Sequence, residues 1–119
     1  MTIQFEESDL AQFSGTTAYH RHWASPVKLT DGVAFMATHG CGWLVDAIVS
    51  HQRNPAVKKL EFQAWHLSVR ADHSCQLFCD DGNGQLNMVM QQIPYTDVPP
   101  SWKLKLWLVD GVLMVPSEY

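Results

Sequence analysis

The stretch GWLVDAIVS (Gly42–Ser50) is nearly all apolar and carries one acidic residue. Its large side chains recur every three or four residues, which predicts a helix over Trp43–Gln52 that ends at Asn54-Pro55. Asp46 and Ser50 form a narrow polar strip on this helix, and apolar residues cover the rest of its circumference. Such a pattern predicts a helix that is buried on most sides.

Two shorter helices are predicted before it. One covers Asp9–Phe13. The other covers Gly32–Thr38 and is capped by Thr30 or Asp31, whose side-chain oxygens suit a helix N-cap. The glycines of His39–Gly42 break the chain between this helix and the apolar one, because glycine tolerates positive φ angles.

After these helices the hydrophobic pattern takes a period of two residues, as in half-buried strands. The predicted strands are Trp65–Val69, Cys75–Cys79, a strand opened by Leu86, Met88 and Met90, a strand over Trp102–Val109, and Val112–Val115. Turns are predicted at Asp80–Gly84 and, from the stronger signal, at Asp110-Gly111. We therefore expect a single α+β domain over residues 1–119. Its N-terminal helices should pack on one face of a C-terminal antiparallel β-meander of about four to five strands. A parallel strand pair would contradict this prediction.

The composition limits the classes of function. The chain has 119 residues, of which 17% are charged, five tryptophans and a formal net charge of −4. This length fits one domain. The negative charge supplies no basic field for nucleic acid. Few charges and many tryptophans favour an apolar contact patch on the surface.

The sequence also predicts a compartment. The N-terminus lacks the basic start and the long apolar run of a signal peptide. No stretch is expected to provide the roughly 18 apolar residues that span a bilayer. The three cysteines, Cys41, Cys75 and Cys79, have spacings that suit no disulfide framework. We therefore predict a cytoplasmic protein with three reduced thiols.

Several motifs resemble those of a family of small bacterial, plasmid and phage proteins whose function is unknown. The matching pieces are LAQFSGT (10–16), YHRHW (19–23), LTDGV (29–33), WLVDAIVS (43–50), FQAWHL (62–67), CDDGN (79–83), DGVL (110–113) and PSEY (116–119). The resemblance implies an accessory protein of a mobile element, and for some members an action against host defence. It supplies no catalytic motif. Similar sequences carry an Ala-rich join where this chain has Gly40-Cys41-Gly42.

We predict a non-enzymatic accessory or inhibitory protein that binds a protein partner, without a cofactor or a metal. The predicted partner-binding residues are Tyr19, His20, His22, Trp23, Lys105 and Trp107. The first four lie on a segment predicted to be irregular, where binding residues are common, and tryptophan often anchors an interface. Asp46 is assigned a structural role as acceptor for Arg21, His20 or a tryptophan N–H. If Trp23 and Trp107 are buried, the acidic turn Asp80–Asp81 is the predicted contact site instead. Homo-oligomerisation is left open.

A metal- or thiol-dependent enzyme is one alternative, and it would use His20, His22, Cys41 and Asp46. Zinc takes three or four ligands, whereas the His-x-His pair supplies two. A thiol at a helix N-terminus has a lowered pKa, but a cysteine nucleophile also needs a base. Cys75 and Cys79, if on one strand, lie about 13 Å apart and cannot share a metal.

A nucleic-acid-binding protein is the other alternative. Lys103, Lys105 and Trp107 would lie on one face of a strand, and interleaved basic and aromatic side chains can bind single strands. Two lysines in an acidic chain make this hypothesis the weaker one.

Overall fold

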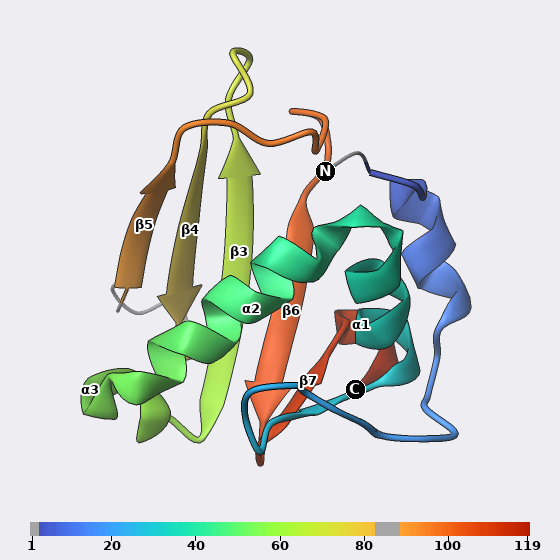
Figure 1. The fold of residues 1–119 in the computed structure, drawn as a ribbon, viewed down its shortest axis with the longest axis vertical. Coiled ribbons are helices and arrows are strands. Elements are labelled where there is room, and N and C mark those ends of the chain that lie inside the picture. The colour runs from blue at the N-terminus through green and yellow to red at the C-terminus, as the bar shows by residue number, and fades with distance from the viewer. Residues whose placement is uncertain (1–2, 83–88) are drawn as a thin grey trace.

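A mixed sheet of seven strands forms one layer of the molecule, and the helices cover one face of it (Figure 1). The computed structural model describes residues 3–82 and 89–119. The strands are β1 (His20–Arg21), β2 (Lys28–Leu29), β3 (Phe62–Val69), β4 (Cys75–Asp80), β5 (Val89–Ile93), β6 (Leu104–Val109) and β7 (Val112–Met114). Their order across the sheet is β1-β2-β7-β6-β3-β4-β5. The mixed α and β class is therefore as predicted.

The helical layer is one broken run followed by a short helix. Its parts are α1 (Asp31–Met36), the kinked turn Ala37–Cys41, α2 (Gly42–Ser50), the 3-10 turn His51–Arg53 and α3 (Pro55–Lys58). Thr30 caps α1, because its hydroxyl oxygen accepts a hydrogen bond from the N–H of Val33 at 3.5 Å. The kink lies at His39 and Gly40, where Gly40 has a φ of 109°. The break predicted from the glycines is thus confirmed.

Two predicted helices have different bounds. The segment predicted as helix over Asp9–Phe13 is a 3-10 turn over Glu7–Gln12. The helix predicted over Gly32–Thr38 ends at Met36, because the kink begins before the glycines are reached.

The apolar helical run ends at Arg53, with Asn54 in an extended conformation, as predicted from Asn54-Pro55. The short helix α3 that follows was not predicted. Asn54 accepts a hydrogen bond from the N–H of Ala56 at 3.0 Å and caps α3, which begins at Pro55. Proline suits the first helical position, since its fixed φ is helical and the N–H it lacks would have no partner there.

The core lies between α2 and the sheet. Leu44, Val45 and Ile48 of α2 are buried, and the indole of Trp65 on β3 is 1% exposed beneath them. Burying an aliphatic or aromatic side chain of this size stabilises the fold by about 1.5–3 kcal/mol. The predicted burial of the apolar helix is confirmed. Within the described residues, the opposite face of the sheet carries no helix (Figure 1).

The predicted antiparallel meander is wrong in three respects. The sheet has seven strands, because β1 and β2 precede the helices and are two residues each, too short to show an alternating pattern. The strand β6 lies beside β3, not beside β5. Finally, β2 pairs in parallel with β7, with Leu29 opposite Leu113. The chain between β2 and β7 runs through the helical layer and through β3–β6, which gives the long connection that a parallel pair requires.

Two predicted turns have different outcomes. Asp110 and Gly111 both have positive φ angles, 52° and 75°, and join β6 to β7 as predicted. The predicted turn Asp80–Gly84 extends beyond residue 82, and its last two residues lie outside the described residues. So do Leu86 and Met88 of the third predicted strand, which the structure gives as β5.

The carboxylate of Glu118 joins the C-terminal turn Pro116–Glu118 to the start of α1. It accepts hydrogen bonds from the hydroxyl of Thr30 at 2.6 Å, the N–H of Gly32 at 3.1 Å and the N–H of Val115 at 3.1 Å. A Cβ atom on Gly32 would lie 2.7 Å from the Glu118 Oε1 atom, so this contact requires glycine. Two of the matching motifs, LTDGV and PSEY, therefore meet in space.

The helical run Asp31–Arg53 is long and apolar enough to cross a membrane by length and composition. This corrects the expectation that no stretch of the chain would qualify. Half of its most apolar window is buried inside the structure, where α2 packs on the sheet. A core helix passes the same test of length and composition, so the finding is weak evidence for a membrane span.

Replacing Glu118 by alanine should lower the free energy of unfolding by about 1–3 kcal/mol, because the partly buried Gly32 and Val115 N–H groups lose their acceptor. Urea unfolding followed by circular dichroism measures this change. Glu61→Ala is the matched control, since the Glu61 side chain makes no hydrogen bond or ion pair with any described residue. Equal midpoints for the two variants would show that the Glu118 carboxylate does not stabilise the fold.

Candidate groove beside Trp23

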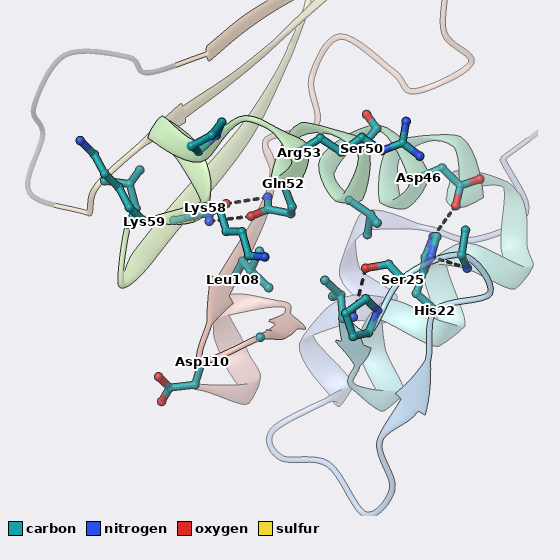
Figure 2. A pocket seen from close by; sticks show the side chains of 18 of the residues that line it. His22, Ser25, Asp46, Ser50, Gln52, Arg53, Lys58, Lys59, Leu108 and Asp110 are labelled. Carbon is teal, nitrogen blue, oxygen red and sulfur yellow. Dashed lines mark hydrogen bonds and ion pairs between the residues drawn. The ribbon is translucent and has the colours of Figure 1, made fainter.

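A groove opens between α2, α3, the loop of residues 22–27 and the turn of the β6–β7 hairpin (Figure 2). Its volume is about 1070 Å³. The apolar part of its lining comes from Pro26, Val27, Val49, Pro55, Leu60 and Leu108. This concavity on the helical side is the candidate site, and we call it the groove.

A pair of glutamines stiffens the floor of the groove. Gln52 and Gln63 exchange two amide hydrogen bonds of 2.8 Å each. Gln63 is 2% exposed, and its Oε1 atom also accepts from the indole N–H of Trp65 at 2.9 Å. Its amide donates to the carbonyl of Val57 at 3.1 Å. Each buried polar atom of this pair therefore has a partner, which ties the 3-10 turn His51–Arg53, α3 and β3 together.

One carboxylate oxygen organises the end of the groove. Asp46 Oδ1 accepts from His22 Nε2 at 2.8 Å and from the indole N–H of Trp23 at 3.1 Å. The N–H of Ala24 points at His22 Nδ1 from 3.1 Å. An amide N–H can only donate, so Nδ1 is the acceptor and the ring proton is on Nε2. His22 therefore acts as a neutral strut between the loop and α2.

Trp23 stands exposed at this end of the groove. Its side chain is 82% exposed, although its N–H is bound to Asp46. The indole stacks on His22 at a centroid distance of 5.6 Å. A large apolar ring is thus held in one orientation with most of its surface in water.

Charged side chains line both ends of the groove. Asp46 lies at one end and Lys58 and Lys59 at the other, with Asp110 on the hairpin side (Figure 2). Across residues 3–82 and 89–119, the side chains of Lys58, Lys59 and Arg53 make no hydrogen bond or ion pair. These cations were not predicted as site residues. The only signal for them was that three of the eight Lys and Arg residues fall within seven positions.

The structure separates the six predicted partner-binding residues. Trp23 lies at the groove, and Tyr19 is 60% exposed nearby in sequence. His22 is 5% exposed and both its ring nitrogens are occupied, so it supports Trp23 and presents no free surface. Lys105 and Trp107 lie on the face of the sheet that the helices leave uncovered.

His20 has a partner of its own. Its Nε2 atom lies 3.0 Å from Asp31 Oδ1, and Asp31 Oδ2 accepts from the N–H and hydroxyl of Thr17. The hydrogen bond from the Thr17 N–H, followed by that from His20, holds the pKa of Asp31 well below its usual range. His20 and His22 therefore bind two different carboxylates and do not form a common site.

The uncovered face of the sheet carries an aromatic cluster. Trp107 lies 5.2 Å from Phe62 and 5.3 Å from Tyr119, measured between ring centroids. Tyr119 meets Trp107 at 80° and Phe62 at 74°, so the rings pack edge to face against one another. This arrangement does not present parallel free ring faces, which is what stacked bases need.

A model of a family of unknown function, DUF6876, matches residues 4–119. The chain belongs to this family. No curated protein and no solved structure matches it.

The geometry of this DUF6876 chain does not favour the enzyme alternative. Among the described residues, no group of three or more His, Cys, Asp or Glu side chains could hold a metal ion. Cys41 is fully buried, and burial raises the pKa of its thiol to about 12. The lowered pKa expected at a helix N-terminus is therefore wrong, because desolvation outweighs the helix dipole.

The three thiols of the native protein should resist modification at neutral pH. Cys41, Cys75 and Cys79 are all 0% exposed, and burial raises the pKa of Cys79 to about 12 as well. Dithiobis(nitrobenzoate) should release little chromophore from the folded chain and three equivalents after unfolding in guanidinium chloride. Rapid reaction of one thiol in the folded chain would contradict this burial.

Replacing Asp46 by alanine should lower the free energy of unfolding by about 1–3 kcal/mol, because the buried His22 Nε2–H then lacks an acceptor. Asp46 was expected to be a buried carboxylate on the apolar helix, but its side chain is 48% exposed. The cost therefore arises from the buried side chain of His22. Urea midpoints of Asp46→Ala and of Ser50→Ala, a control on the same helix face, measure the effect. Equal midpoints would exclude this structural role.

Proposed function

We propose that this protein is a non-enzymatic binding module that takes a segment of a partner protein into the groove, with Trp23 as the anchor. The observation that carries the proposal is an indole 82% exposed yet fixed by a hydrogen bond and a stacking contact. Tryptophan is enriched among the residues that dominate binding energy at interfaces. Because the Trp23 ring is already held in one orientation before the partner binds, less conformational entropy is lost on binding.

The shape and lining of the groove support a peptide segment as the occupant. A volume of about 1070 Å³ lies just above the range for small-molecule sites, roughly 300–1,000 Å³. Its apolar floor and charged ends suit a segment with an apolar centre and polar flanks. Lys58 and Lys59, whose side chains pair with no described residue, leave charge available for such flanks.

The biological setting remains a proposal that rests on the motif resemblance. An accessory or inhibitory protein of a mobile element that acts on a host defence complex would need a binding surface and no active site, which fits the occupied ring nitrogens of His22. Cytoplasmic location is likewise a prediction, and the oligomeric state is left open. Light scattering of purified protein tests self-association.

Site-specific photocrosslinking tests the groove directly. A photoreactive residue in place of Ser50 on the groove wall should capture the partner in cells, whereas one in place of Ser68 on the uncovered sheet face should not. Trp23→Ala should weaken capture by about thirtyfold, the loss for a hot spot worth 2 kcal/mol. Quantitative mass spectrometry of the crosslinked bands measures the yield.

Trp107→Ala is the matched tryptophan control. The sequence predicts Trp107 as a contact residue and hence a loss of capture for this variant too, whereas the groove proposal requires capture to be retained. Capture from position 68 and loss with Trp107→Ala alone would overturn the proposal and move the interface to the uncovered sheet face. The free energies of unfolding of both variants must match that of the parent within about 1 kcal/mol, because a larger loss of stability would itself reduce binding.

A further inference from the structure

One carboxylate oxygen of Asp46 accepts no hydrogen bond from a described residue, and the donors at its other oxygen are uncharged. Both of its hydrogen bonds arrive at Oδ1, and across residues 3–82 and 89–119 no donor reaches Oδ2. The two donors are neutral, since His22 carries its single proton on Nε2 and an indole has no charge. In Figure 2 the second oxygen of Asp46 points away from His22. A carboxylate that is 48% exposed is therefore available to a cation.

The indole beside this carboxylate offers a surface for the same cation. Trp23 donates its N–H to Asp46 and stacks on His22. With 82% of the side chain exposed, the rest of the ring remains open. An open indole attracts cations placed over its face, and tryptophan does so more strongly than other aromatic residues.

We infer that Trp23 and Asp46 together form a binding site for an arginine side chain of the partner protein. The inference rests on the proposed function, because the groove segment supplies the arginine. A guanidinium group can stack on the indole and donate to Asp46 Oδ2 at the same time, since it is planar and carries five N–H donors in one plane. A lysine ammonium can donate to Asp46 Oδ2, but it has no planar face that could stack on the indole at the same time.

The cations of the chain leave this site open. Arg21, which was predicted as a partner of Asp46, makes no ion pair with it among the described residues. Arg53 lies seven residues along the same helical run, and in Figure 2 its side chain extends toward Asp46, although the two make no ion pair. Lys58 and Lys59 lie at the far end of the groove (Figure 2). The two lysines are therefore separated from Asp46, and Arg53 is the cation whose influence on the site has to be tested.

The test uses the full-length protein and blocked tripeptides as probes. Gly-Arg-Gly should shift the indole N–H resonance of Trp23 in ¹H–¹⁵N spectra, with a dissociation constant on the order of 1 mM. Trp23→Phe identifies that resonance. The isosteric peptide with citrulline, which is neutral, should bind at least about tenfold more weakly, as should the lysine peptide.

Asp46→Asn is the decisive variant. Asparagine keeps an acceptor oxygen for Trp23 and His22 but removes the charge, so the fold should persist while affinity for Gly-Arg-Gly falls about tenfold or more. Arg53→Gln, which removes the nearest cation on the helix, should bind the probe at least as well as the parent. Equal binding of the arginine and citrulline peptides, or unchanged affinity in Asp46→Asn, would overturn the inference.

The outcomes also separate this inference from the proposed function. Crosslinking from position 50 without any Trp23 shift by the arginine peptide would overturn the arginine site and leave the groove as the interface. A Trp23 shift together with crosslinking from position 68 only would overturn the groove as the partner interface.

Discussion

The fold depends on the carboxylate of Glu118, which bridges two ends of the sequence. It binds the backbone of α1 at Gly32 and the hydroxyl of Thr30, 88 residues earlier in the chain. The charge sits where the first N–H groups of a helix lack partners, so one group satisfies several unmet donors. The same contact holds β2 beside β7, because Thr30 follows β2 and Val115 follows β7. Glycine at position 32 is the condition for this approach.

This bridge also determines where the candidate site lies. The loop of residues 22–27 connects β1 to β2, and those short strands join the sheet only through the pairing of β2 with β7. Once β2 is fixed, His22 reaches Asp46 on α2 and closes the end of the groove. The position of an exposed indole therefore depends on a contact at the far end of the chain from it.

The sequence is informative wherever a pattern repeats over several residues. The helical period of Gly42–Ser50, the alternation in β3, β4 and β6 and the Asp110-Gly111 turn all leave such a pattern, and each element was predicted. Two-residue strands leave none, so β1, β2 and the parallel pairing of β2 with β7 were missed. Asp46 was expected to bind a tryptophan N–H, among other donors, because a lone carboxylate on an apolar helix needs a partner. Which tryptophan it binds depends on contacts between distant segments, and no local pattern encodes those.

The histidines illustrate how polar chemistry is used in this chain. Each of the six has an acceptor: Asp31, Asp46 and Asp80 for His20, His22 and His66, and carbonyl or amide oxygens for His39, His51 and His73. Four of them also stack closely on an aromatic ring within 5.6 Å, namely His22, His39, His51 and His66. A ring held in this way is a structural link, because its orientation and its proton are fixed by neighbours. Asp46 differs from the other acceptors, since two neutral donors bind its Oδ1 atom and no cation pairs with its carboxylate among the described residues. This carboxylate lies beside the exposed indole of Trp23, and the proposed arginine site rests on that pair of groups.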